Sequence, residues 1–187
     1  MQAYHAGQRI FGENKVQEMV AKWEALPRDI EWHMIGHLQR NKVKYMAPFV
    51  SLIHGVDSLR LLREIDKRAS QNQRVVDCLL QVHIARESTK FGFDGQELGE
   101  LLESGLLKEL PHVCIRGLMG MATFTEDQEQ VRLEFRNLKA HFEKLQEHVN
   151  TADTLSMGMS GDYRIAIEEG STMVRIGSSI FGPRNTA

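Results

Sequence analysis

Short apolar runs alternate with helical patterns along nearly the whole chain, and this alternation limits the folds that the sequence can adopt. Strict alternation of strand and helix predicts parallel strands, because the chain must cross back over the sheet before the next strand begins. The apolar runs show little alternation with polar residues, which indicates burial on both faces. The candidate strands are residues 9–11, 32–35, 49–54, 75–82, 113–119, 154–156 and 173–176.

Capping residues mark where several helices should begin. Ser58 precedes one apolar helical stripe, and Asp94 with Glu97 forms a capping-box pattern before another. Thr125 with Gln128 repeats this pattern before the clearest helical period in the chain. The apolar stripe of that helix consists of Val131, Phe135, Leu138, Phe142, Leu145 and Val149.

Glycine and polar residues collect just after the candidate strands, among them Asn14, His37 and the run 156–160. Parallel strands end at a common edge, so these residues should gather on one rim, as in a (β/α)8 TIM-type barrel. That fold usually takes roughly 200 to 250 residues, whereas this chain has 187 residues. We therefore predict an α/β barrel that lacks one βα unit, formed as a single domain over residues 1–187.

Composition excludes several classes of protein. A hydrophobic fraction of 42% with 26% charged residues is ordinary for a globular domain. The formal net charge of -2 and the dispersed Lys and Arg residues do not favour nucleic-acid binding. Cys78 and Cys114 both lie in apolar runs, which indicates buried thiols in a reducing compartment. The sequence contains neither a membrane-length apolar run nor a signal-peptide pattern, so we expect a cytoplasmic protein without a membrane partner.

Near the end of the sequence, two strand-then-turn units follow one another. In the first, residues 154–160 pass from an apolar strand end into small residues, and Ser160 or Asp162 can cap the next helix. In the second, a strand carrying Arg175 breaks into residues 177–179, where missing Cβ bulk and free N–H groups let the backbone close on an anion. An isolated Gly-Ser-Ser turn is weak evidence, but the pair with its arginine predicts a site for a phosphorylated small molecule.

Two other sequence features, a pair of histidines and a basic segment, do not predict a binding site. His33 and His37 have a spacing that would suit a metal on a helix, but this segment is a strand entering a turn, so we expect no metal site there. A modest basic face over residues 60–68 lies among acidic residues and is expected to be solvated.

Seven motifs, in a fixed order, resemble one family. Together they resemble the pyridoxal 5'-phosphate (PLP) homeostasis protein family, the single-domain relatives of the alanine racemase barrel. The resemblance implies a fold-type III PLP barrel that binds the cofactor and affects PLP pools, without a demonstrated turnover reaction. The motifs are FGENKVQE (11–18), WHMIGHLQRNK (32–42), VDS (56–58), ESTKFG (87–92), GLMGM (117–121), LSMGMSGD (155–162) and VRIGSSIFGPR (174–184).

The resemblance also implies roles for particular residues. Ser160 with the backbone of Gly177 and Ser178 would hold the PLP phosphate, which agrees with the site read from the residues alone. Arg175 would face the pyridine nitrogen, where a cation disfavours protonation and leaves the ring a weaker electron sink. That environment suits a carrier better than a versatile catalyst. The residues expected near the ring or its substituents are Met157, Met159, Asn14 and His37, although methionines are often core filler.

In one respect this sequence departs from the family. Family members hold PLP through a lysine on the first barrel strand, and this chain begins within the helix that follows that strand, so the lysine has no counterpart. Substitutes could be Lys15, Lys42, Lys44 or Lys90, but an exposed ammonium near its usual pKa forms imines poorly, and we assign none of them.

Without that strand, we expect a gap between the strands near Phe11 and Val174, with exposed backbone edges. Either the sequence is truncated, or the seven units close or dimerise to cover the gap, as a monomer or a weak homodimer. Two other functions remain open at this stage: a PLP-dependent racemase-like enzyme, and a fragment that no longer binds the cofactor.

Overall fold

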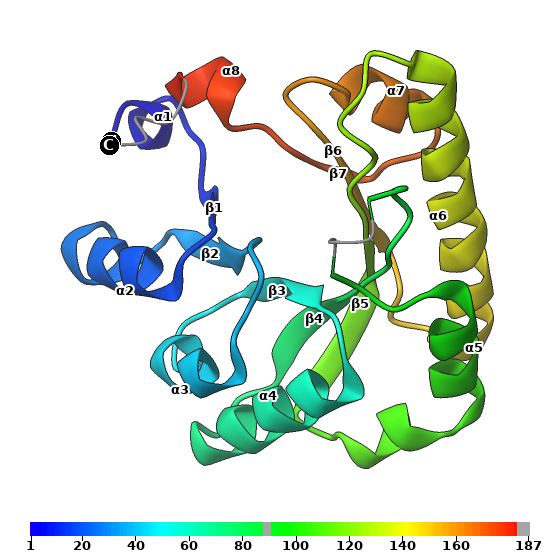
Figure 1. Ribbon diagram of the computed structural model, residues 1–187. Helices are drawn as coiled ribbons and strands as arrows, with labels where there is room; N and C mark the ends of the chain where they lie inside the picture. The colour runs from blue at the N-terminus through cyan, green and yellow to red at the C-terminus, as the bar shows by residue number, and fades with distance from the viewer. Residues whose placement is uncertain (88–90, 183–187) are drawn as a thin grey trace.

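Seven parallel strands pair in the order in which they occur along the chain. The structure is a computed structural model and describes residues 1–87 and 91–182. Figure 1 shows the strands following one another around a curved sheet, with the helices outside it. The strands are β1 (Ile10–Glu13), β2 (Glu31–Met34), β3 (Leu52–Val56), β4 (Val76–Gln81), β5 (Val113–Met119), β6 (Thr154–Met159) and β7 (Met173–Arg175).

Helical crossovers connect the strands. The prediction of an α/β barrel built from parallel strands is confirmed. The α-helices are α1 (Gln2–His5), α2 (Val16–Ala25), α3 (Val43–Met46), α4 (Leu59–Gln71), α5 (Gly95–Glu103), α6 (Gln128–His148), α7 (Tyr163–Glu168) and α8 (Ser178–Phe181), and two 3-10 helices are η1 (Arg40–Lys42) and η2 (Leu106–Glu109).

The barrel is nearly closed. Within residues 1–87 and 91–182, hydrogen-bonded pairing runs from β1 to β7 and does not join these two strands to each other. The gap expected between the strands near Phe11 and Val174 is therefore present in the described part of the chain. The edges of β1 and β7 are the two unpaired edges of the sheet.

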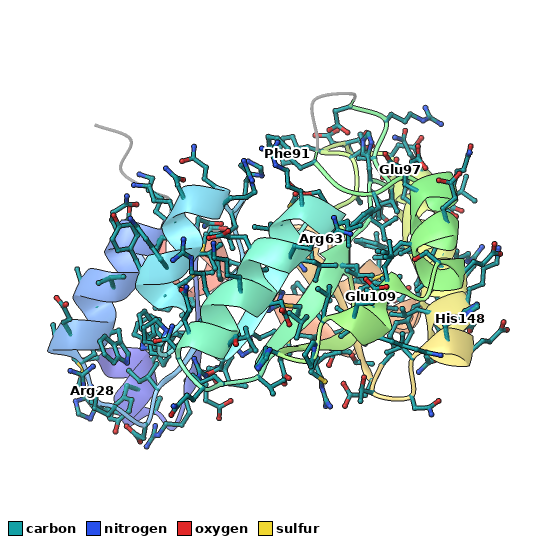
Figure 2. All side chains as sticks on the ribbon, turned by 90° about the horizontal axis from the view of Figure 1, so that it is seen from below. Arg28, Arg63, Phe91, Glu97, Glu109 and His148 are labelled. Carbon is teal, nitrogen blue, oxygen red and sulfur yellow. The ribbon has the colours of Figure 1, made fainter. Side chains whose placement is uncertain are left out.

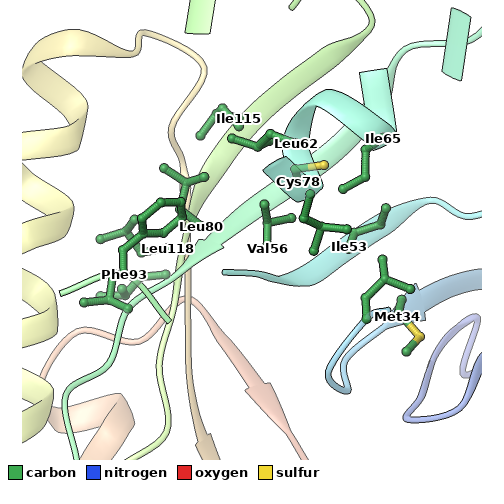
Figure 3. Packing of buried hydrophobic residues seen from close by; sticks show 14 of the residues in the cluster. Met34, Ile53, Val56, Leu62, Ile65, Cys78, Leu80, Phe93, Ile115 and Leu118 are labelled. Atoms are coloured by element: carbon green, nitrogen blue, oxygen red, sulfur yellow. The ribbon is translucent and has the colours of Figure 1, made fainter. Parts of the chain in front are cut away.

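The main core lies between the sheet and the helices. Ile53 and Cys78 face Leu62 and Ile65 of α4 in this cluster (Figure 3). Because side chains alternate along a strand, their neighbours point into the barrel. A smaller inner cluster contains Leu52, Leu79 and Met119, with Met121 and Met173 packed against it.

Two of the predicted helix caps are present in the structure. The Ser58 hydroxyl accepts a hydrogen bond from the Leu61 amide, and the Asp94–Glu97 capping box is complete. The capping box predicted at Thr125 is wrong. The helix begins at Gln128, and the Asp127 side chain caps it instead. Asp127 stands directly before the first helical residue, where its carboxylate can reach the free amides of the first turn.

Two strand boundaries differ from the prediction. The strand expected at 49–54 begins at Leu52, because the Phe49 amide closes a turn onto the Met46 carbonyl. The strand expected to end at Ser156 continues through Met159, because Met159 pairs with Arg175 of β7. Pairing with a neighbouring strand thus overrides the turn tendency of the small residues.

The cysteines differ in burial. Cys78 is fully buried, whereas Cys114 is only partly so, and the prediction of two buried thiols is wrong for Cys114. Both thiols are free. In the described ranges, no helix combines the length and the apolar character that crossing a membrane requires.

Gly117 permits the close pairing of β5 with β6. It has a φ of +151°, and a Cβ there would overlap the Thr154 carbonyl oxygen. We predict that Gly117→Ala lowers the free energy of unfolding by at least about 3 kcal/mol, because neither the backbone angle nor the neighbouring strand can adapt cheaply.

Urea denaturation would measure this change. Gly99→Ala is the matched control, since a Cβ at Gly99 in α5 would meet nothing within 4 Å and should raise stability by roughly 0.5 to 1 kcal/mol. Equal effects of the two substitutions would contradict the packing argument.

Candidate functional site

The carboxyl ends of the parallel strands bring the residues of the candidate site to one rim of the barrel. Asn14 follows β1 directly, and His37 follows β2. Ser160 follows β6, and Gly177 lies just beyond β7 at the start of α8. This is the edge at which barrels of this type place their sites.

Ser160 and the segment 177–179 form a small cradle of hydrogen-bond donors, which we call the amide cradle. The backbone amides of Gly177 and Ser179 both donate to the Ser160 hydroxyl oxygen, at 3.2 and 3.3 Å. The two amides therefore already converge on one oxygen acceptor. Residues 177 to 179 are exposed, and a Cβ at Gly177 would meet no atom within 4 Å. The cradle thus has open space beside its donors.

The predicted helix cap in this region is not made. Asp162 stands at the N-cap of α7 without a side-chain cap bond. Its carboxylate accepts a hydrogen bond from the Met159 amide at 2.6 Å instead, and Ser160 turns toward α8. The first of the two expected turn units is therefore a strand end that is tied down by Asp162, with only Ser160 contributing to the cradle.

Arg175 projects from β7 into the barrel and is anchored by three hydrogen bonds. Its Nη1 donates to the Ser156 carbonyl at 2.9 Å and to the Ser156 hydroxyl at 2.6 Å, and its Nη2 donates to the Gly120 carbonyl at 3.0 Å. A guanidinium has five N–H donors, so these bonds position the group without using all of them. Burial lowers the pKa of Arg175 to about 10, while the nearby Asp162 carboxylate acts in the opposite direction. The guanidinium remains charged at neutral pH.

A chain of buried polar side chains continues from Arg175 across the barrel interior. The Ser156 hydroxyl lies 3.0 Å from His54 Nδ1, and His54 Nε2 lies 3.1 Å from His33 Nδ1. Burial lowers the pKa of His33 to about 4. Burial, followed by the charge on Arg175 and the neighbouring His33, holds the pKa of His54 well below its usual value. Both imidazoles are therefore neutral near pH 7.

The methionines predicted beside the ring lie in different environments. Met157 is fully buried in the main core cluster, on the helix side of β6. Met159 is 37% exposed at the rim end of the same strand. Of the two, only Met159 has exposed surface at the rim, and it directly precedes Ser160 of the cradle in the chain.

Asn14 and His37 lie on the β1 and β2 side of the rim, away from the cradle in strand order. Asn14 is exposed, and its backbone packs closely against Gly36. The His37 ring stacks on Phe91 with centroids 3.8 Å apart, and its Nδ1 lies 3.2 Å from the Asp57 carboxylate. The contacts within the described residues join Ser160, Gly177 and Ser179, but they do not link Asn14 or His37 to them.

The lysines weighed as substitutes for the family lysine have other surroundings. Lys15 pairs with Glu18 at 3.2 Å. Lys42 and Lys44 lie over the ring of Tyr45. Lys90 lies outside the described residues. In the described part of the chain, no group of three or more His, Cys, Asp or Glu side chains is placed to hold a metal ion.

Sequence reasoning missed the buried chain of Ser156, His54 and His33. A signal was available, because each histidine stands inside an apolar strand pattern, as in LIHGV and WHMI. A polar side chain inside a buried strand needs a hydrogen-bond partner. Only the folded barrel shows that these two histidines and Ser156 are one another's partners.

Comparisons with known proteins identify a matching family and similar relatives. The family described as "Alanine racemase, N-terminal domain" matches residues 1–185. The pyridoxal phosphate homeostasis protein of Aquifex aeolicus is 48% identical over 183 residues, covering 97% of this chain and 79% of that protein.

Solved structures show the same fold. PipY of Synechococcus elongatus without PLP superposes with a TM-score of 0.90 at 37% identity, covering 97% of this chain and 85% of that one. The structure of PipY with PLP bound gives 0.85 at 36% identity, with the same coverage. Alanine racemase of Bartonella henselae, at 17% identity, shares the fold with a TM-score of 0.70, over 99% of this chain and 53% of that one.

The buried histidines make stability depend on pH. In the folded protein His33 takes up a proton only near pH 4, whereas its usual pKa is 6.5. Below pH 6.5 the unfolded chain therefore binds more protons than the folded chain, and stability falls as the pH falls toward 4. The expected loss is about 3 kcal/mol for this residue.

Urea denaturation between pH 7.5 and 4 would measure this dependence. His33→Gln should flatten the dependence, whatever its effect on absolute stability, while His148→Gln, at an exposed position, should leave it unchanged. An unchanged slope in His33→Gln would contradict the assignment of a neutral buried His33.

Proposed function

The chain belongs to the pyridoxal phosphate homeostasis protein family, and from that premise we propose that it binds PLP at the amide cradle and acts in PLP homeostasis. The single observation that carries the proposal is the convergence of the Gly177 and Ser179 amides on one oxygen, 3.2 and 3.3 Å away. The name of the Aquifex aeolicus relative and the PLP-bound structure of PipY support the same reading.

The residues of the cradle fit a phosphate ester. Backbone amides that point at a common acceptor are suited to an anionic oxygen. The space beside Gly177, where a Cβ would meet nothing within 4 Å, leaves room for the remaining oxygens. Ser160 and Ser178 would complete the set, because their hydroxyl hydrogens can donate to those oxygens.

Arg175 would orient the ring. Its three hydrogen bonds to Ser156 and Gly120 hold the guanidinium in one place, and its remaining N–H donors are available to an unprotonated pyridine nitrogen. When bound, PLP supplies an aldehyde that combines with amines and a ring that withdraws electrons. A fixed cation at the nitrogen disfavours protonation of the ring, so these residues favour holding the cofactor over extensive carbanion chemistry.

The proposal also covers the residues around the ring, the extent of the domain, its oligomeric state and its location. Met159 would lie against the ring from the end of β6, and Asn14 and His37 would approach it from β1 and β2. Met157 would act only as packing beneath β6. We propose one cofactor-binding domain over residues 1–187, present as a monomer or weak homodimer in the cytoplasm, where its free cysteines would remain reduced.

Loss of the cradle should weaken PLP binding without loss of the fold. We predict that Ser160→Ala raises the Kd for PLP roughly tenfold, since hydrogen bonds to a charged group contribute about 1.5 kcal/mol or more. Gly177→Ala should have an effect of similar size, because its methyl group would enter the space beside the amides. Fluorescence titration with PLP would measure both. Ser70→Ala, on the exposed face of α4, is the control, and an equal Kd in all four proteins would contradict the site.

Binding itself has an independent readout in thermal stability. A ligand that binds only the folded state must stabilise it by RT ln(1 + [L]/Kd), which is about 2.7 kcal/mol at a hundredfold excess over Kd. We therefore predict a clear rise in Tm with saturating PLP. An unchanged Tm would support the alternative of a fragment that no longer binds the cofactor.

Borohydride reduction of the mixture, followed by mass spectrometry, tests how the cofactor is held. We expect no lysine adduct at the cradle, and an adduct on one lysine would show that a substitute exists. Conversion of one amino-acid enantiomer into the other would favour the racemase-like alternative.

A further inference from the structure

A second cluster of cationic side chains lies on the outside of the barrel, between η1 and α4. It borders an open groove of about 490 Å³. The groove follows β2 and β3 in the fold, whereas the amide cradle follows β6 and β7. We call it the cationic groove, and its lining residues are Arg40, Leu59, Arg60, Arg63, Glu64 and Lys67.

The spacing of the helical cations places them in a line. Arg60, Arg63 and Lys67 are three and four residues apart on α4, so they share one face of the helix. The interval of seven residues from Arg60 to Lys67 spans roughly 10 Å at 1.5 Å per residue. All three are exposed, as is Arg40 on η1. Figure 2 labels Arg63 on the outer surface of α4.

The positive charge of this groove is not neutralised by neighbouring acids. Glu64, the one acid that lines it, accepts a hydrogen bond from Arg68 at 2.6 Å. Asp66 turns to the other side, where it accepts from the His112 amide at 2.8 Å. Among the described residues, Arg40, Arg60, Arg63 and Lys67 form no ion pair.

The direction of the helix adds to this charge. The groove includes the first turn of α4, a helix of 13 residues whose start is capped by Ser58. The N-terminal end of such a helix carries a partial positive charge from the aligned peptide dipoles. Four exposed cations and the helix end therefore act on one open volume.

We propose that the cationic groove binds a linear polyphosphate anion with three or more negative charges, as found in nucleoside triphosphates and inorganic polyphosphate. Arginine side chains grip phosphate oxygens through two parallel N–H donors. A line of three cations over roughly 10 Å matches a chain of phosphates better than a single phosphate, which can contact only one or two of them. The net charge of the protein is -2, and the line of cations on α4 is only roughly 10 Å long, which favours a small anion over a nucleic acid. This site does not depend on the proposed PLP function.

Isothermal titration with inorganic tripolyphosphate would test the proposal. We expect binding at one site per chain, and at least tenfold weaker binding in the double variant Arg60→Gln/Arg63→Gln. The control Lys108→Gln/Lys144→Gln removes the same charge from two exposed lysines elsewhere and should bind as the wild type does. Equal weakening in the two variants would show a response to net charge only and would overturn the site, as would absence of binding to the wild type.

Chemical modification gives a second test that needs no variant. Tripolyphosphate should slow the acetylation of Lys67 severalfold and leave that of Lys108 unchanged, as measured by mass spectrometry. Equal protection of both lysines, or of neither, would overturn the proposal. PLP titration of the double variant should give the wild-type Kd, so failure of this site and failure of the amide cradle are separable.

A competition experiment would distinguish a nucleotide from inorganic polyphosphate as the bound anion. Adenosine triphosphate that displaces tripolyphosphate at lower concentration would assign the groove to nucleotides, and the reverse order would assign it to inorganic polyphosphate. Displacement by a short single-stranded oligonucleotide at a hundredfold lower concentration than either would overturn the assignment to a small anion.

Discussion

Parallel pairing of consecutive strands is the constraint on which the rest of this structure depends. Because β1 to β7 pair in chain order and in one direction, every strand ends at the same rim. The cradle at Ser160 and Gly177 exists only because β6 and β7 are neighbours whose ends coincide. The same constraint explains the close contact at Gly117, where a Cβ would overlap the backbone of β6. Strand pairing thus sets both the position of the site and the positions that must remain glycine.

Inside the barrel, a network of buried polar side chains holds the Arg175 guanidinium in a fixed position. Arg175 can only donate hydrogen bonds, so Ser156 accepts from it and links it to His54 and then to His33. Burial keeps both imidazoles neutral, which limits electrostatic repulsion beside the cation. The four residues come from β2, β3, β6 and β7, so this hydrogen-bonded network connects strands that are far apart in the sheet order. Such a network positions Arg175 more firmly than a solvent-exposed arginine could be held.

The two anion sites inferred for this protein differ in construction. The amide cradle uses backbone donors at fixed positions, which suits one phosphate group in one orientation. The cationic groove uses long side chains on the outside of α4, which suits a flexible anion with several charges. The cradle lies at the ends of β6 and β7, close to Arg175 of β7, where the backbone is fixed by strand pairing. The groove lies on the outer surface between η1 and α4, where side chains are exposed to solvent.

The periodicity of the sequence determined the fold class, the helix stripes and the gathering of glycine and polar residues at one rim, because alternation of strand and helix is a local property of the chain. The small residues at 177–179 likewise indicated an anion cradle before the fold was known. Tertiary structure alone decided that β6 extends through Met159, that Ser160 faces α8 while Asp162 holds the strand end, and that His33, His54 and Ser156 support Arg175. The physical reason is that each of these features depends on a hydrogen-bond partner from another strand or helix, and local sequence preference carries no information on which distant groups the fold brings within 3 Å or so of each other.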